Sequence, residues 1–293
     1  MLRQQLGDIV IDRIVESEEP NFDPLVFFPQ SRAEDWLAHK GWMQPHALHP
    51  ASGWLILTLQ SYLVRTRHHT ILVDTCVGDQ KKRLGKVTPP SWHMASGGVL
   101  LDKLAAAGVA PEAIDYVMCT HLHSDHVGWN TRLVDGRWVP TFPNARYVMS
   151  RKELAHWQSV HDSHPLESLA DSVLPIVEAG RADLVSSDFA LDDEVWLEPT
   201  PGHTPDHFSV RLASNGGDAV ITGDLLHSPV QCRKPSWGSL ADFDATLASR
   251  TRRAFLERCC DTGMLVCGTH FPSPSFGRVV PHADAFHFAY EAA

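Results

Sequence analysis

Residues 120–126 of this chain read Thr120-His121-Leu122-His123-Ser124-Asp125-His126. They follow an apolar run at residues 114–119, which predicts a buried strand. In extended backbone, His121 and His123 point to the same side and can bind one ion. Asp125 and His126 begin the next element and can turn toward a second ion beside the first. The segment therefore predicts adjacent metal-binding positions at the end of a strand.

The four polar side chains of this segment are typical ligands of zinc and comparable divalent metals. Burying four such groups together without a metal would be costly, because buried polar groups must be paired. The alternative is a solvated loop that happens to be rich in histidine. We disfavour it because the preceding strand places the loop at the end of a sheet, where α/β proteins carry their chemistry.

Strand-like and helix-like segments alternate along the rest of the chain, as is typical of a layered α/β fold. His68 and His69 are expected at an exposed hairpin turn, Asn215-Gly216 at a second turn, and Pro175 at the end of a helix. The apolar patterns predict strands at residues 54–65, 70–74, 114–119, 145–149, 195–197, 207–212, 219–222 and 264–267, and helices at residues 99–107, 152–158, 166–174 and 245–259.

Composition indicates an ordinary soluble globular protein, with 43% hydrophobic and 20% charged residues in 293. No linker divides the chain, so we predict one domain over residues 1–293. The net charge is −10, and we interpret the short basic runs at residues 81–83 and 250–253 as solvated surface charge. A nucleic-acid partner is therefore not expected. The six cysteines form no C-x-x-C pair and are expected to be free buried thiols. With neither a signal peptide nor a membrane span apparent, we expect a cytoplasmic protein that binds no membrane.

The spacing His-x-His-x-Asp-His after a strand resembles the signature of the metallo-β-lactamase superfamily of hydrolases. Further segments resemble the rest of the family's pattern, in the same order, between about residues 55 and 271. They are residues 71–75, which close on Asp74, residues 201–205 around His203, residues 222–224 ending in Asp224, and residues 268–272 around His270. One motif could arise by chance, but several in order make the resemblance specific.

The resemblance implies an α/β fold, a four-layer αβ/βα sandwich of two mixed β-sheets flanked by helices. It also implies two divalent metal ions, which we expect to be Zn²⁺. Asp74 would contact the metal ligands without binding a metal itself. The resemblance assigns His121, His123 and His203 to one metal, Asp125, His126 and His270 to the other, and Asp224 to both. A hydroxide bridging two cations is a strong nucleophile at neutral pH. Asp125 is the expected catalytic residue, which accepts the hydroxide's proton and delivers it to the leaving group.

Differences among members of the superfamily restrict the classes of reaction that we expect this chain to catalyse. Di-iron redox members carry a glutamate where this chain has His123, and RNA-processing members usually need basic surfaces. Glutathione-thioester hydrolases carry a basic C-terminal extension, whereas residues 283–288 are largely apolar. The remaining branch resembles N-acyl-homoserine lactonases and methyl-parathion-type hydrolases. We therefore predict a lactonase or carboxylic-ester hydrolase. The alternatives are a phosphotriesterase or dehalogenating hydrolase of the same fold, and a non-catalytic metal-binding or redox module, against which the complete ligand set argues.

Several aromatic and histidine side chains near the motifs indicate what kind of substrate to expect. Trp92, Trp129, Trp237 and Phe271 lie near the motif loops and could form the wall of an apolar pocket, although each alone is more typical of core packing. As a group they favour a neutral, partly apolar small molecule as substrate. His227 is expected in or near the pocket and not as a ligand. For His207 a supporting role and a structural role stay open, as does a homodimer for the whole protein.

Overall fold

The computed structural model describes residues 2–85 and 88–292. The chain divides into two compact units. Unit 1 comprises Met1–Glu16 and Leu59–Phe189, and unit 2 comprises Ser17–Thr58 and Ala190–Ala293. Strands β2 (Ile9–Phe22) and β3 (Leu55–Arg65) each contribute residues to both units. The single domain expected from the sequence stays a prediction.

Unit 1 is organised around a mixed seven-stranded sheet in the order β1-β2-β3-β4-β5-β8-β9. The β1–β2 and β3–β4 pairs are antiparallel, and β4, β5, β8 and β9 are parallel neighbours. The strands that complete this sheet are β1 (Arg3–Leu6), β4 (Thr70–Val73), β5 (Tyr116–Met118), β8 (Arg146–Ser150) and β9 (Ala182–Val185). A separate hairpin joins β6 (Thr131–Val134) to β7 (Arg137–Pro140).

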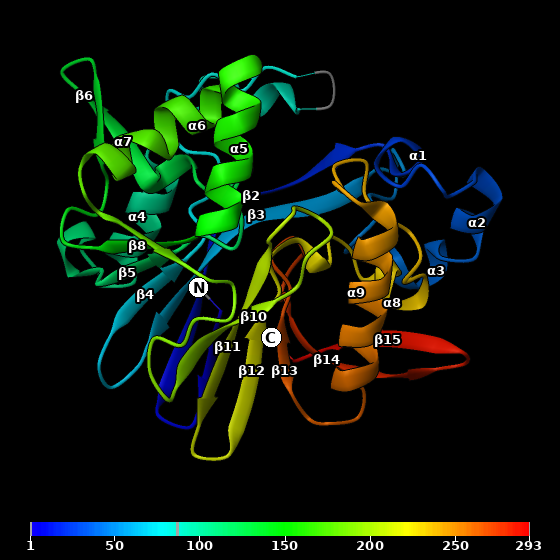
Figure 1. Cartoon of the computed structure of the whole chain (residues 1–293). Helices are drawn as coiled ribbons and strands as arrows, with labels where there is room; N and C mark the ends of the chain where they lie inside the picture. The colour runs from blue at the N-terminus through cyan, green and yellow to red at the C-terminus, as the bar shows by residue number, and fades with distance from the viewer. Residues whose placement is uncertain (1, 86–87, 293) are drawn as a thin grey trace. The chain divides into compact units, whose positions relative to one another are not determined.

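Helices of unit 1 lie against this sheet (Figure 1). The helix at Val99–Ala106 buries two leucines that are spaced four residues apart. Leu100 and Leu104 are fully buried and pack in one core with Val117 and Tyr147 of the sheet. Burial of each leucine stabilises the fold by roughly 1.5–3 kcal/mol. The helices of unit 1 are α4 (Val99–Ala106), α5 (Arg151–Ser163), α6 (Glu167–Ser172) and α7 (Leu174–Glu178), with 3₁₀ turns η1 (Pro90–Trp92), η2 (Pro111–Ala113) and η3 (Gly128–Asn130).

Unit 2 contains a six-stranded sheet in the order β10-β11-β12-β13-β14-β15. All neighbours are antiparallel except β12 and β13, which run parallel. The strands are β10 (Val195–Pro199), β11 (Phe208–Ser214), β12 (Gly217–Ile221), β13 (Leu265–Cys267), β14 (Phe276–His282) and β15 (Ala285–Tyr290). The helices are α1 (Pro24–Phe27), α2 (Ala33–Leu37), α3 (Lys40–Met43), α8 (Val230–Arg233) and α9 (Ala245–Cys259), with the 3₁₀ turn η4 (Gly223–Leu225).

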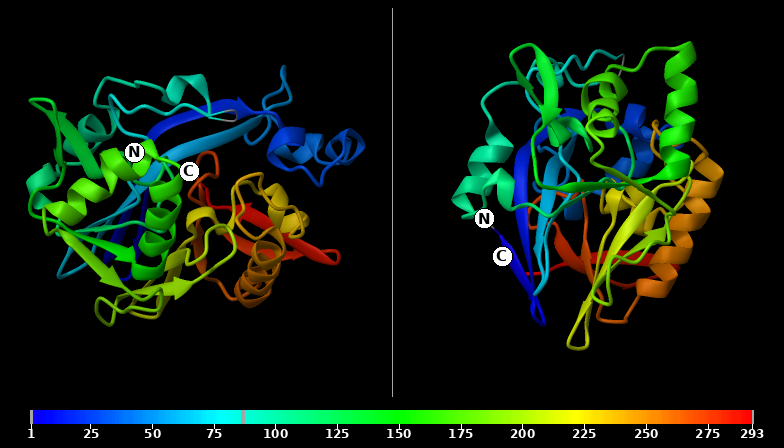
Figure 2. Two further views of the ribbon diagram at one scale, coloured as in Figure 1. Left: turned by 45° about the horizontal axis from the view of Figure 1, so that its top comes forward. Right: turned by 60° about the vertical axis from the view of Figure 1, so that its left-hand side comes forward.

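The local chemistry of unit 2 explains two of its sharpest features. The β11–β12 hairpin (Figure 2) turns at Asn215 and Gly216, whose φ angles of 49° and 79° suit a two-residue turn with left-handed backbone. Helix α9 begins at Asp244, whose side chain accepts a hydrogen bond of 2.9 Å from the Leu247 amide. Its apolar face buries Phe255 and Leu256 in the core of this sheet.

Most predicted elements are present, with shifts of a few residues at their ends. His68 and His69 lie in the turn between β3 and β4, and His68 is exposed as expected, whereas His69 is half-buried. The helix expected at residues 166–174, which Pro175 was predicted to end or kink, ends at Ser172, and Pro175 lies in the first turn of the next helix, α7. The sequence prediction also missed the β14–β15 hairpin, although its strands form the edge of the second sheet.

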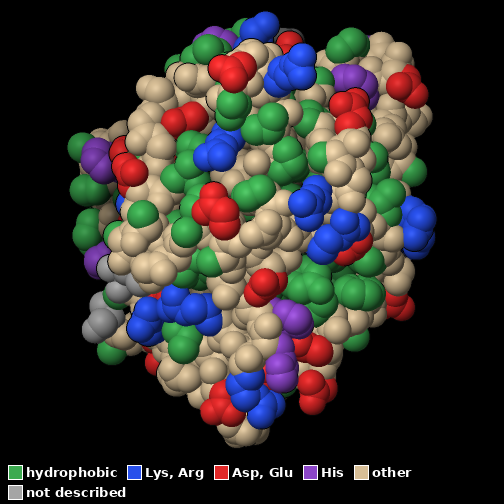
Figure 3. Space-filling model, turned by 90° about the vertical axis from the view of Figure 1, so that its left-hand side faces the viewer, with side chains coloured by type: hydrophobic (Ala, Val, Ile, Leu, Met, Phe, Trp, Pro, Cys, Tyr) green, Lys and Arg blue, Asp and Glu red, His purple; other side chains and the backbone are tan. Residues whose placement is uncertain are grey.

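The interpretation of both basic runs as solvated charge is wrong for three residues. Lys81 and Arg252 are fully buried and Arg83 is 4% exposed. Arg83 forms a two-pronged ion pair with Asp171, at 2.9 and 3.1 Å, which stabilises both charges inside the protein. On the face shown in Figure 3, acidic and basic side chains are mixed with each other.

Two further expectations concern the cysteines and the membrane. All six cysteines, which fall within the described ranges, are free, and five of them are buried. In residues 2–85 and 88–292, no helix combines the length and apolar character that crossing a membrane requires.

Candidate metal centre

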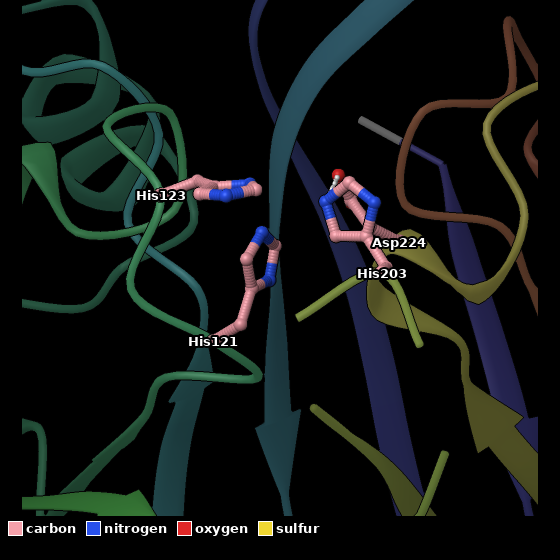
Figure 4. A group of neighbouring side chains, drawn as sticks. All are labelled: His121, His123, His203 and Asp224. Atoms are coloured by element: carbon pink, nitrogen blue, oxygen red, sulfur yellow. Dashed lines mark ion pairs between the residues drawn. The ribbon is translucent and has the colours of Figure 1, made fainter. Parts of the chain in front are cut away.

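In unit 1, the segment after β5 displays the histidines and aspartate singled out in the sequence. The rings of His121 and His123 lie 4.6 Å apart between centroids, at an angle of 81° (Figure 4). The ring of His126 lies 4.0 Å from that of His121. His121 and His126 are buried, whereas Asp125 keeps 15% of its side chain exposed. The loop thus groups three imidazoles beside a carboxylate that solvent can reach.

Asp74 supports this loop from the end of the neighbouring strand β4. Its Oδ1 accepts a hydrogen bond of 2.8 Å from the Thr120 amide, and its Oδ2 accepts one of 2.8 Å from the Thr120 hydroxyl. His126 Nδ1 lies 2.9 Å from Asp74 Oδ2 and must be the donor, since a carboxylate only accepts. The Thr120 hydroxyl gives its proton to Asp74, so its oxygen is an acceptor for His121 Nδ1 at 3.1 Å. Both rings therefore keep the lone pair of Nε2 for another partner.

Replacing Asp74 with asparagine should weaken metal binding while leaving the loop in place. Asp74 has a φ of 58°, a left-handed conformation that asparagine tolerates. The substitution removes the charge that holds the proton on His126 Nδ1. Loss of such a supporting partner typically lowers metal affinity about 10–100-fold. Competition with a zinc chelator would measure the change, and an affinity equal to that of the wild type would contradict this role of Asp74.

Backbone contacts fix the loop after His126 against the loop after Asp74. The Thr75 amide donates to the His126 carbonyl at 2.7 Å, and the Gly128 amide donates to the Cys76 carbonyl at 2.8 Å. A Cβ added at Gly128 would lie 1.9 Å from the Val77 carbonyl oxygen. Only glycine permits this close crossing of two backbones. This crossing fixes the position of the end of the segment at residues 120–126, the ligand loop, within unit 1.

In unit 2, three imidazoles converge on the carboxylate of Asp224, which lies in the turn η4 after β12. His203 Nε2 lies 3.2 Å from Asp224 Oδ2, the ion pair drawn in Figure 4, and His227 Nε2 lies 3.1 Å from the same oxygen. His270 Nε2 lies 3.0 Å from Asp224 Oδ1. All four residues are buried. The centre of this unit is a buried carboxylate surrounded by nitrogen donors.

The hydrogen bonds made by Nδ1, the ring nitrogen that does not face Asp224, distinguish His203 and His270 from His227. His203 Nδ1 donates to Asp242 at 2.8 Å, and His270 Nδ1 donates to the Thr58 carbonyl at 2.8 Å. Their Nε2 atoms therefore direct lone pairs at Asp224 when the rings are neutral. His227 Nδ1 has no hydrogen-bond partner among the described residues. His227 can therefore protonate Nε2 and donate to Asp224 as a neutral ring.

The pKa shifts agree with this distinction. Burial lowers the pKa of His203, but the charge and hydrogen bond of Asp224, followed by those of Asp242, outweigh it and raise the pKa to about 9. Burial also lowers the pKa of His227, and there the neighbouring His203 and His270 help to keep it low despite Asp224. In unit 2, a positive charge beside Asp224 at the position of His203 is therefore favourable. The ring of His227, by contrast, is favoured in its neutral form.

These donors fit a divalent metal. Lone pairs of His203 and His270 face oxygen atoms of Asp224 at 3.2 and 3.0 Å, an arrangement that is repulsive unless a proton or a cation is present. His126 Nε2, whose ring is protonated at Nδ1, faces Asp125 Oδ2 at 3.7 Å in the same way. Imidazole nitrogens with carboxylate oxygens are the donor set of zinc sites. The residues that could hold a metal are His121, His123, Asp125 and His126 in unit 1 and His203, Asp224 and His270 in unit 2.

Sequence reasoning missed Asp242 as a support of His203. The two residues are 39 positions apart, and no motif or periodic pattern marks Asp242. The histidine at position 207, whose role the sequence left open, is a second support. Its Nδ1 lies 2.8 Å from the Thr200 hydroxyl and 3.2 Å from the Thr200 carbonyl, and its Nε2 accepts from the Asp224 amide at 2.9 Å. His207 therefore positions the backbone of Asp224.

Three of the four aromatic residues considered for a pocket wall lie in hydrophobic cores. Phe271 is fully buried with its ring 4.7 Å from Phe288, and Trp129 and Trp237 are 3% and 6% exposed. Their bulk fills the interior, so they do not support an aromatic pocket wall. Trp92 is half-buried in η1. Within unit 2, an aromatic ring that contacts His227 is Phe27, at 5.3 Å between centroids, and the sequence did not indicate this contact.

Comparison with known proteins identifies the family. The model of the metallo-beta-lactamase superfamily matches residues 59–284. An N-acyl homoserine lactonase of a Bacillus species is 27% identical over 205 residues, which cover 66% of this chain and 73% of that protein. The crystal structure of the hydrolase AbOPH, of the beta lactamase superfamily, aligns with a TM-score of 0.80 at 24% identity, covering 99% of this chain and 97% of that one.

A further solved structure has the same fold. AidC, a dizinc quorum-quenching lactonase in complex with a product, aligns with a TM-score of 0.77 at 22% identity, covering 100% of this chain and 97% of that one. The α/β fold class expected from the sequence is confirmed, and so is the class of enzyme, a metal-dependent hydrolase. The chain belongs to the metallo-β-lactamase superfamily.

Proposed function

We propose that this protein hydrolyses a neutral lactone or carboxylic ester with the help of two divalent metal ions, which we expect to be zinc. The observation that carries the proposal is the set of histidines whose Nδ1 proton is held by a carboxylate or carbonyl, which fixes the tautomer in which Nε2 carries the lone pair that binds a metal. By the family pattern, His121, His123 and His203 would hold the first metal, Asp125, His126 and His270 would hold the second, and Asp224 would contribute to both.

The side chains of the chain itself would have distinct roles in this reaction. When bound, the metals would activate a water molecule and polarise the carbonyl group under attack. Asp125 is the half-buried carboxylate of the ligand loop, so it can exchange protons with substrate and solvent. It would accept the proton of the attacking water and return it to the departing alkoxide oxygen. His227 would keep a neutral ring with its Nε2 proton on Asp224.

The preference for a neutral substrate rests on charge and on the relatives. A net charge of −10 repels anions at low ionic strength. The Bacillus relative is a lactonase, and AidC was solved with N-hexnoyl-L-homoserine as product. These relatives support a lactone over the alternative, a phosphotriester, for which the described residues offer no specific observation.

A comparison of substrates tests the proposal. We expect a higher kcat/KM for a medium-chain lactone than for a glutathione thioester, because the thioester carries negative charge. An aryl phosphotriester serves as the neutral control with a different reacting centre. A preference for the thioester by about tenfold, which is 1.4 kcal/mol of transition-state stabilisation, would overturn the assignment. A higher kcat/KM for the phosphotriester than for the lactone would instead support the alternative function, a phosphotriesterase.

A further inference from the structure

The guanidinium of Arg252 links the two ligand-bearing segments of unit 2. Arg252 lies in α9 and is fully buried. Its Nε donates to the Leu225 carbonyl at 2.8 Å, and Leu225 is the neighbour of Asp224 in η4. Its Nη2 lies 3.6 Å from Asp242 Oδ2, and Asp242 accepts the Nδ1 proton of His203. One side chain thus contacts the segment that presents Asp224 and the carboxylate that orients His203.

We propose that Arg252 is a positioning residue that sets His203 and Asp224 in the geometry needed to bind a metal. The inference rests on the proposed function in that it assumes the metal, but it concerns a residue outside the family's ligand pattern. Arg252 acts through the Leu225 carbonyl on one side and through Asp242 on the other.

The surroundings of Asp242 show why a cation is needed at this point. Its Oδ1 accepts from His203 Nδ1 and from the Ser239 hydroxyl, both at 2.8 Å, and its Oδ2 accepts from the Ser239 amide at 2.9 Å. The Arg252 guanidinium faces the other oxygen of this buried carboxylate at 3.6 Å, so its positive charge helps to hold Asp242 in the position that orients His203.

Other contacts hold the guanidinium and its helix in one orientation. Nη1 donates to the carbonyls of Pro235 and Trp237, each at 3.0 Å. Helix α9 also approaches the loop that carries His203. The Thr251 hydroxyl donates to the Pro201 carbonyl at 2.8 Å, and a Cβ on Gly202 would lie 2.3 Å from the Ala248 amide nitrogen. These contacts therefore hold the guanidinium in one position. A lysine has a single nitrogen and cannot contact Leu225 and Asp242 in the same way.

The test compares Arg252→Lys and Arg252→Gln with Arg253→Lys and Arg253→Gln on the same helix. Arg253 is the matched control, because its side chain is 54% exposed and pairs only with Glu257 among the described residues, at 3.0 Å. Each protein is stripped of metal, its unfolding in denaturant is measured, and its zinc affinity is then measured by chelator competition. We expect the Arg252 variants to bind zinc about 10–100-fold more weakly while the Arg253 variants match the wild type.

Two readouts separate a positioning role from a merely structural one. A structural role would lower the stability of the metal-free protein and leave zinc affinity within twofold of the wild type, and this result would overturn the proposal. If neither Arg252 variant folds, Asp242→Asn decides, because it removes the charge that Arg252 faces. An unchanged zinc affinity of Asp242→Asn overturns the proposal, and a loss of about tenfold or more supports it.

The same experiment distinguishes this proposal from the proposed function. A wild-type protein that binds zinc but hydrolyses neither lactones nor esters would contradict the proposed function and leave the role of Arg252 standing. A protein that hydrolyses lactones, with zinc affinity unchanged in the Arg252 variants, would contradict the role of Arg252 alone.

Discussion

Replacement of His270 with alanine is expected to remove one metal from the protein and to lower kcat by several orders of magnitude. His270 follows β13, and its ring is fixed by the hydrogen bond from Nδ1 to the Thr58 carbonyl. Its Nε2 lone pair faces Asp224 Oδ1 at 3.0 Å, where only a proton or a cation satisfies both atoms. Alanine removes this donor, and since metal binding stabilises the folded state, thermal stability should fall as well.

His227→Ala is the matched control, because His227 is equally buried and contacts the same carboxylate at 3.1 Å. Its Nδ1 has no hydrogen-bond partner in residues 2–85 and 88–292, so the neutral ring can donate from Nε2 and no metal is required beside it. The variant should keep two metals and change mainly KM or the choice of substrate. Metal analysis and steady-state kinetics on both variants check this. Loss of a metal from His227→Ala, with both metals retained by His270→Ala, would show that the ligand assignment in unit 2 is wrong.

Gly128→Ala is expected to destabilise the protein by at least about 3 kcal/mol, the upper end of the range for overpacked sites. The added methyl group would lie 1.9 Å from the Val77 carbonyl oxygen and 2.5 Å from the Gly78 amide nitrogen. These are backbone atoms, which cannot move aside as a flexible side chain can. Separation of the two loops would also displace His126, whose carbonyl accepts the Thr75 amide. The variant should therefore lose both stability and metal.

Gly41→Ala provides the control for this substitution. Gly41 lies in α3, and a Cβ there would meet no atom within 4 Å. Alanine favours helix over glycine, so stability should stay the same or rise by up to about 1 kcal/mol. Unfolding in denaturant measures both changes. A Gly128→Ala protein within about 1 kcal/mol of the wild type would contradict the close crossing of the two loops.

The parts of the structure that were predictable are those with local signals. The amphipathic spacing of residues 245–259 predicts α9 with its observed bounds, and Asn215-Gly216 predicts the turn whose left-handed backbone these residues favour. The histidine and aspartate motifs pointed to the segments that carry the candidate metal ligands, because each motif follows a strand. Very short helices were not predicted, since α1, α2 and α3 have only four or five residues each and show no full period of apolar spacing.

The supporting residues were not predictable, because their partners are distant in the sequence. Asp242 meets His203 across 39 positions, and the Thr58 carbonyl meets His270 across 212. Arg252 was misread for the same reason. In the sequence it belongs to a basic run, and only the folded chain surrounds it with carbonyls and Asp242. A charged residue inside a helical pattern therefore gives no sign of its burial until its partners are known.

Metal analysis by plasma spectrometry, on protein purified without chelators, tests the central claim most directly. The proposed set of seven ligands, in which Asp224 would be shared between two ions, predicts close to two divalent metals per chain, with zinc as the expected ion. A reproducible content of one metal per chain that added zinc does not raise would contradict the two-metal centre.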